Sequence, residues 1–206
     1  WHEPGDNIGS FTMGQWKAGV VKTGEIVQEI RAARGPRCLI ENGFVLEGPW
    51  DFDSANTTYG QVPYGPVDWT FTPAQLAYVD WVGIDPYLTA ANQPAMERLM
   101  TYDDSGRLNT QTRTMMQWLA GYGKKIIVAE WGVTSNSQTD QAKADKIRSA
   151  WTWFKAWNVA HPELPFEAVL YFHYNLEADV TWEVLGAGEE LAKQALVDIL
   201  ADAKAT

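Results

Sequence analysis

The segment KKIIVAEWGV, residues 124–133, decides the class of fold. The apolar run IIVA, rich in β-branched residues, is typical of a strand that is buried on both faces of a sheet. The run ends on an acid, Glu130, which Trp131 and Gly132 follow. Parallel α/β sheets place their functional side chains at the carboxyl ends of strands. Glu130 is therefore the first candidate site residue.

Helix and strand patterns alternate on both sides of this segment. Other strands are expected at 37–46, 78–87 and 167–174, and helices at 13–34, from 73, at 108–122, at 141–159 and at 189–203. Gly35-Pro36 is a stop signal for the first helix, and Thr72-Pro73 is a start signal for the second. Apolar strands separated by helices predict a parallel sheet, and the absence of a linker or repeat predicts one domain, residues 1–206.

Two architectures fit this order of elements. A (β/α) barrel has eight strands in about 250 residues, whereas this chain shows four strands and the strand end Trp1-His2-Glu3. An open doubly wound sheet is the alternative, although neither a GxGxxG nor a P-loop sequence follows any strand. A start at the carboxyl end of a strand favours the second part of a barrel. Upstream residues or another chain would then complete it.

Composition restricts the partners. The formal net charge is -10, so a nucleic acid or an anionic membrane surface would be repelled. A neutral polysaccharide fits better. The 11 tryptophans supply rings that can stack on sugars or fill a core. No apolar run is long enough for a transmembrane helix.

Two acids end strand-like runs, Glu3 in WHEP and Glu130 in IIVAEWG. A pair of carboxylates that face each other across a cleft is what glycoside hydrolysis requires. The sequence has no HExxH pair and no GxSxG elbow, which disfavours a zinc enzyme or an esterase. We therefore expect neither a metal nor another cofactor.

Three motifs carry a resemblance to a known group. WHEP at 1–4, VDWVGIDPY at 79–87 and IIVAEWG at 126–132, in this order, resemble the last five βα units of clan A glycoside hydrolases, most nearly family 26. That family is the β-mannanase and β-glucanase group. The resemblance covers nearly the whole chain. It implies a (β/α)8 TIM barrel, of which this chain holds roughly strands 4 to 8, and retaining, endo-acting hydrolysis of a β-linked polysaccharide of the mannan or glucan type.

The same resemblance implies residue roles. Glu3 matches the general acid/base and Glu130 the nucleophile. Glu3 must stay protonated near neutral pH, so its pKa must be raised by burial or by the other carboxylate. Glu130 must be ionised, and the two carboxyl groups of a retaining enzyme lie about 5–5.5 Å apart. Tyr87 matches a tyrosine whose hydroxyl hydrogen-bonds the nucleophile, and His2 is placed beside the acid/base, where it would bind substrate.

Aromatic side chains are the expected platforms for the sugar. Trp131 would either floor the sugar site or pack in the core. At the last strand, YFHYN (171–175) departs from the tryptophan that clan A enzymes commonly place under the bound sugar. Tyr171, His173 or Tyr174 could replace it. In the long segment 47–71 the expected platforms include Trp50 and Trp69.

Two other functions remain open. The departure at YFHYN motivates a catalytically inactive glycan-binding barrel module in a cell-surface or phage-tail assembly. A structural α/β domain whose acids are incidental is the third reading. The enzyme would be secreted or extracellular, whereas the binding module could belong to a virion tail.

Overall fold

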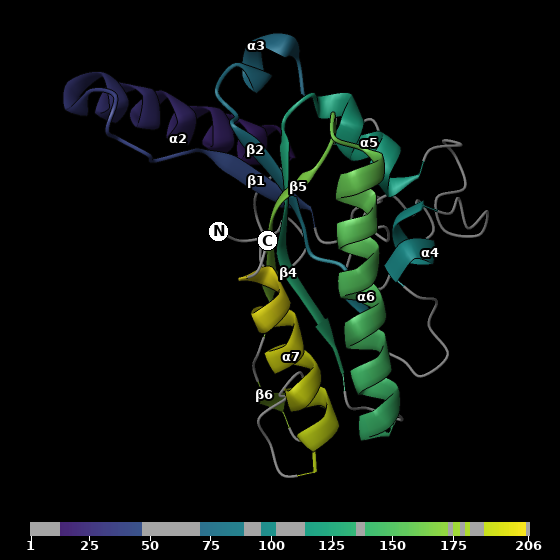
Figure 1. The fold of residues 1–206 in the computed structure, drawn as a ribbon. Coiled ribbons are helices and arrows are strands. Elements are labelled where there is room, and N and C mark those ends of the chain that lie inside the picture. Colours follow the sequence, from purple (N-terminus) through teal and green to yellow (C-terminus); the bar gives the residue numbers. More distant parts are fainter. Residues whose placement is uncertain are drawn as a thin grey trace.

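The computed structural model of this chain describes residues 13–46, 71–88, 96–101, 114–134, 139–172, 175–177, 180–181 and 188–204. The helices are α2 (Met13–Arg34), α3 (Pro73–Leu76), α4 (Met96–Thr101), α5 (Met115–Tyr122), α6 (Asp140–Ala160) and α7 (Glu190–Ala203). The strands are β1 (Gly43–Leu46), β2 (Trp81–Ile84), β3 (Tyr87–Leu88), β4 (Lys125–Val133), β5 (Phe166–Tyr171), β6 (Asn175–Glu177) and β7 (Val180–Thr181). The fold is mixed α/β, as the sequence predicts (Figure 1).

Five strands form a parallel sheet in the order β1-β2-β4-β3, with β5 paired to β4. β2 lies along the first part of β4, and β3 lies along its last part, at Gly132 and Val133. β2 and β3 therefore lie on the same side of β4 as two parts of one extended segment. The segment is interrupted at Asp85-Pro86, where proline has no N–H to donate. Among the described strands the order does not reverse as it does in a doubly wound sheet.

Helices pack against one face of the sheet. The strand register aligns a row of fully buried side chains on this face, namely Phe44, Val82 and Ile126. Trp16 of α2 packs edge-on against Phe44, with 5.5 Å between ring centroids. Tyr122 of α5 packs edge-on against the same ring at 5.4 Å. Helices from different parts of the chain therefore cover one side.

Helix α6 covers the same face farther along the sheet. Its Phe154 contacts Phe166 of β5 at 5.2 Å between ring centroids. Phe166 is the cross-strand partner of Ile126, so it lies on the face of the buried row. Figure 1 shows α6 running alongside β4 and β5, with α7 beside it. We call this side of the sheet the helix-covered face.

The first turns of α6 and α7 are joined by polar contacts. The Asp140 carboxylate accepts hydrogen bonds from the backbone N–H groups of Leu191 and Ala192, at 2.8 and 2.9 Å. The ammonium of Lys143, fully buried, lies 3.3 Å from a carboxylate oxygen of Glu189. An acid at a helix N-terminus satisfies free N–H groups there. These contacts fix the start of α7 against α6.

Helix boundaries follow the local signals. Thr72 and Gln75 form a capping box at α3, and Thr114 and Gln117 form another at α5. Gly123 ends α5 in the left-handed conformation, at φ 62°. The predicted helix 108–122 begins later in the structure, after the Thr114 cap, and residues 102–113 lie outside the described part of the chain.

Three local details differ from expectation. The predicted strand 37–46 is shorter, because β1 begins at Gly43, where β2 first lies alongside at Trp81. Helix α4 has no counterpart in the expected elements. Its two described core residues, Met96 and Met100, lie one turn apart and are buried, but six residues are too few for a clear periodic pattern. The antiparallel pair β6 and β7 is likewise too short to predict.

Candidate functional site

Tyr87, the first residue of β3, and Glu130, in the second half of β4, lie together. The Tyr87 hydroxyl donates a hydrogen bond to the Oε2 atom of Glu130. Both side chains are partly exposed. A phenol donor of this kind holds a carboxylate in one orientation. The structure therefore contains the hydrogen bond that the family resemblance implies between these residues.

A β-bulge determines which residues of β4 face this site. Between Val128 and Trp131, β4 advances by three residues, while β5 advances by two, from Val169 to Tyr171. Val128 and Trp131 consequently both lie in the core, 0% and 2% exposed. In an unbroken strand, residues two apart share a face, and Glu130 would lie beside Val128. The bulge instead directs Glu130 to the opposite side of the sheet.

Of the two roles expected for Trp131, the structure shows core packing, because its side chain is 2% exposed. Its ring packs edge-on against Phe154 of α6, at 5.7 Å, and against Tyr171 of β5, at 4.9 Å. Tyr171 therefore also lies on the helix-covered face and is not a platform. Burial raises the pKa of the Tyr171 phenol, so its hydroxyl stays protonated at neutral pH.

Phe172 is a site residue that the sequence analysis missed. Its backbone N–H donates to the Trp131 carbonyl oxygen at 2.7 Å. Its ring packs edge-on against Tyr87, with 5.8 Å between centroids and an interplanar angle of 80°. Side chains alternate along a strand. Once Tyr171 faces the helices, the next residue faces the site, and this alternation is the signal that could have identified Phe172.

Several predicted site residues lie outside the described part of the chain: His2, Glu3, Trp50, Trp69, His173 and Tyr174. The separation of the Glu3 and Glu130 carboxyl groups therefore stays a prediction. Asp85, which directly follows β2, is 3% exposed, and its backbone N–H donates to the Leu46 carbonyl at 2.9 Å.

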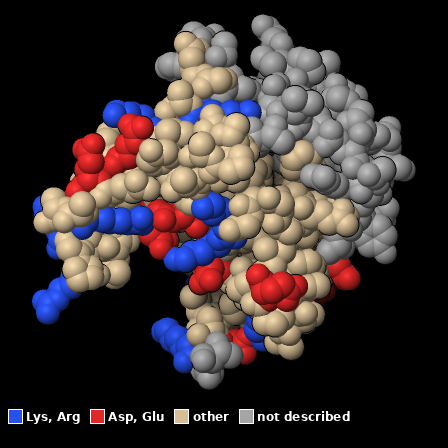
Figure 2. Space-filling model, turned by 90° about the horizontal axis from the view of Figure 1, so that it is seen from above, with Lys and Arg blue, Asp and Glu red and all other residues tan. Residues whose placement is uncertain are grey.

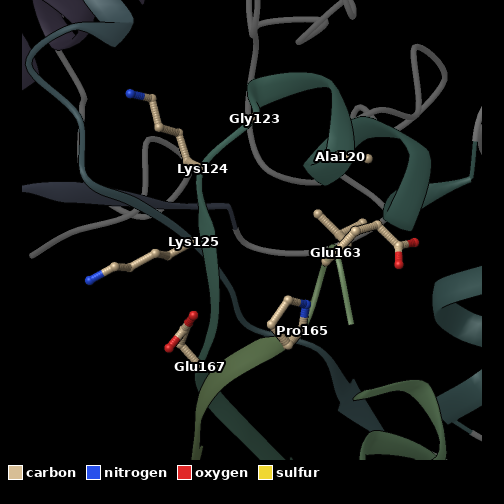
Figure 3. A pocket seen from close by; sticks show the side chains of 8 residues that line it. Ala120, Gly123, Lys124, Lys125, Glu163, Pro165 and Glu167 are labelled. Carbon is tan, nitrogen blue, oxygen red and sulfur yellow. The ribbon is translucent and has the colours of Figure 1, made fainter. Parts of the chain in front are cut away.

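A cavity of about 480 Å³ lies at the other end of the strands, between the starts of β4 and β5. Figure 3 shows Lys124 and Lys125 pointing to one side of it and Glu163 to the other. Lys125 forms an ion pair with Glu41 at 2.6 Å. The charged groups do not converge on one ligand position, so this cavity contributes nothing to the chemistry considered below.

Within the described ranges, no three His, Cys, Asp or Glu side chains lie close enough to hold a metal ion. None of the helices described is both long and apolar enough to cross a membrane.

Comparisons with known proteins identify no family. No family model matches the chain, and no curated protein matches it significantly. Among solved structures, an endo-beta-1,4-glucanase from Xanthomonas axonopodis pv. citri is distantly similar, with a TM-score of 0.40 and 12% sequence identity. The match covers 90% of this chain and 56% of that one, so this chain spans little more than half of the glucanase. So distant a similarity supports no statement about chemistry.

Proposed function

We propose that the protein is a retaining, endo-acting glycoside hydrolase that cleaves a β-linked polysaccharide of the mannan or glucan type, with Glu130 as its nucleophile. The hydrogen bond from Tyr87, the first residue of β3, to Glu130, in the second half of the adjacent parallel strand β4, carries this proposal. A carboxylate that is partly exposed and held in one orientation suits attack on an anomeric carbon.

The reaction proceeds in two steps. Glu130 bonds to the anomeric carbon as the glycosidic bond breaks, and the leaving oxygen takes a proton from the acid, a role we assign to Glu3. A water molecule then attacks the anomeric carbon and gives its proton to Glu3. Glu130 leaves as a free carboxylate. Tyr87 holds Glu130 in line before the first step and donates its hydrogen bond to the carboxylate released in the second.

The scaffold we propose is a (β/α)8 barrel that forms a single domain. Strands that are neighbours in the chain are neighbours in the sheet, and α2, α5 and α6 cover one face of it. In a barrel the helices lie outside, and the site lies at the carboxyl ends of the strands. Glu130 and Tyr87 meet toward the carboxyl end of β4. Upstream residues or another chain would supply the remaining strands, and a polymeric substrate favours an extracellular location.

The test is reducing-end release from mannans, β-glucans and xylans by the wild type and by Glu130→Gln and Tyr87→Phe variants. Without the nucleophile, release should fall at least about a thousandfold. Tyr87→Phe should lower kcat about 10- to 100-fold, because a hydrogen bond to a charged group contributes about 1.5–3 kcal/mol. Tyr122→Phe is the matched control. It changes a buried tyrosine at the end of α5 and should leave the rate unchanged. Near-UV circular dichroism checks that each variant folds.

The outcomes separate the competing functions. Normal turnover by Glu130→Gln would contradict the proposal. Retention on one polysaccharide without any release, even by the wild type, would favour the catalytically inactive glycan-binding module of a cell-surface or phage-tail assembly.

A further inference from the structure

We propose that Tyr171 is a positioning residue for Glu130: across the strand pair, its ring holds the bulge in β4 that turns Glu130 toward the Tyr87 hydroxyl. The role of Glu130 as nucleophile rests on the proposed function. The bulge and its contacts belong to the fold and can be tested without a substrate.

The bulge links the orientation of Glu130 to the burial of Trp131. If β4 lost the extra residue, every side chain after that point would change face. The Glu130 carboxylate would then enter the helix-covered face, and the Trp131 ring would leave it. Burying an unpaired carboxylate and exposing an indole both cost free energy. The position of Trp131 therefore selects the orientation of Glu130.

Tyr171 holds Trp131 in that position from the neighbouring strand. The two residues are cross-strand partners at the point where the register has shifted. Their rings meet edge-on at 4.9 Å, with an interplanar angle of 85°, an arrangement that aromatic pairs prefer. The next residue, Phe172, donates its N–H to the Trp131 carbonyl at 2.7 Å. The ring contact from Tyr171 and the hydrogen bond from the Phe172 N–H therefore both go to Trp131 of the bulged strand.

Tyr171 lies on the opposite side of the sheet from Glu130, so it acts on the site through the bulged strand. Its hydroxyl oxygen is shielded from solvent, and its ring packs against the core on the side away from Glu130. The hydrogen bond from Tyr87 to Glu130 lies on the opposite side of the sheet and reports whether the bulge is intact.

The experiment is NMR on protein labelled with 13C at tyrosine Cζ. Tyr87→Phe assigns the Tyr87 signal by its loss, and Glu130→Ala defines its chemical shift without the hydrogen bond. We expect Tyr171→Leu to move the Tyr87 signal most of the way to the shift seen in Glu130→Ala. Tyr171→Phe keeps the ring and should leave the signal in place. On a substrate, Tyr171→Leu should lower kcat about tenfold or more while KM changes less than about twofold.

Phe166→Leu is the matched control. It removes a core ring from the same strand, 5% exposed and opposite Ile126 at the far end of the pair. It should lower stability without moving the Tyr87 signal, which separates positioning from a general loss of packing. If Tyr171→Leu does not fold, Tyr171→Met, whose unbranched and flexible side chain adapts better to the space left by the ring, carries the same expectation.

Each outcome bears on one proposal. An unmoved Tyr87 signal in folded Tyr171→Leu or Tyr171→Met overturns the positioning role, whether or not the protein is an enzyme. A moved signal in a protein that hydrolyses no polysaccharide supports the positioning of Glu130 and overturns the proposed function alone.

Discussion

The carboxylate of Asp80 ties together three parts of the chain at the starts of β1 and β2. Arg31 of α2 donates two hydrogen bonds to it, at 3.1 and 2.8 Å, and the backbone N–H of Asn42 donates another at 2.8 Å. Burial acts to raise the pKa of Asp80, but Arg31 and Asn42 outweigh it and hold the pKa below its usual value. This side chain lies at the end of the strands far from Glu130, so it serves the fold.

Replacing Asp80 with asparagine should lower the free energy of unfolding by about 2 kcal/mol at neutral pH, because Arg31 loses its charged partner. Since the folded pKa is lowered, this contribution is present above the unfolded pKa of about 3.9 and is lost as the pH falls below it. Urea unfolding of wild type and variant at neutral pH and at about pH 3 measures the difference, which should shrink in acid.

Asp145→Asn is the control for this prediction. Asp145 is 63% exposed and lies 3.8 Å from Arg148, so its loss should change the free energy of unfolding by less than about 0.5 kcal/mol. A difference between wild type and Asp80→Asn that is the same at both pH values would contradict the role of the ionised carboxylate.

At the scale of elements, α2 lies close against the loop that enters β2, and Gly24 makes this approach possible. A methyl group at Gly24 would lie 2.3 Å from the carbonyl oxygen of Tyr78 and 2.8 Å from the amide nitrogen of Asn42. That amide is fixed by its own hydrogen bonds, to the carbonyls of Val20 at 3.1 Å and of Tyr78 at 2.7 Å. The helix therefore packs against backbone atoms, which cannot move away by a change of rotamer as a flexible side chain can.

Two glycines of α2 should respond to alanine with opposite signs. Gly24→Ala should lower the free energy of unfolding by about 1–3 kcal/mol, because the methyl group overpacks the contact. Gly19 has no atom within 4 Å of its would-be Cβ, so Gly19→Ala should raise that free energy by about 0.5–1 kcal/mol through helix propensity alone. Urea unfolding measures both. Stabilisation by both changes would show that α2 does not approach the loop this closely.

At the scale of the whole molecule, net charge opposes contact between copies, and the edge of β5 that no described strand pairs with favours it. The chain carries a formal net charge of -10, and Figure 2 shows acidic and basic side chains intermingled on the described part of the surface. Among the described strands, β5 pairs only with β4, and its Leu170 is 55% exposed. Net charge keeps copies apart, whereas an apolar edge that no described strand covers favours strand pairing between them.

Salt should therefore promote self-association. Raising the ionic strength from about 10 mM to about 0.5 M shortens the Debye length to a few ångströms, so the repulsion fades while the edge remains. Sedimentation velocity should show more association of the wild type at high salt, and Leu170→Lys should suppress it. Val159→Lys makes the same change of charge at a residue of α6 that is 83% exposed. Equal suppression by both variants would assign the effect to charge and not to the edge.

The sequence by itself determined the class of fold and every described helix except α4. The predicted helix 13–34 matches α2 at both ends, and Thr72 caps α3 as its sequence indicates. Apolar periodicity, caps and glycine stops act over a few residues, so they can be read locally. Resemblance in short motifs added the contact between Tyr87 and Glu130, which the structure contains.

Only the tertiary structure decided which side chains of β4 and β5 face the site. Regular alternation would put Val128 and Glu130 on one face and Trp131 on the other. The bulge reverses this, placing Trp131 in the core and Phe172 beside Tyr87. Strand register depends on pairing between segments far apart in the chain, and a shift of one residue changes the face of every side chain beyond it. No local sequence pattern encodes that shift.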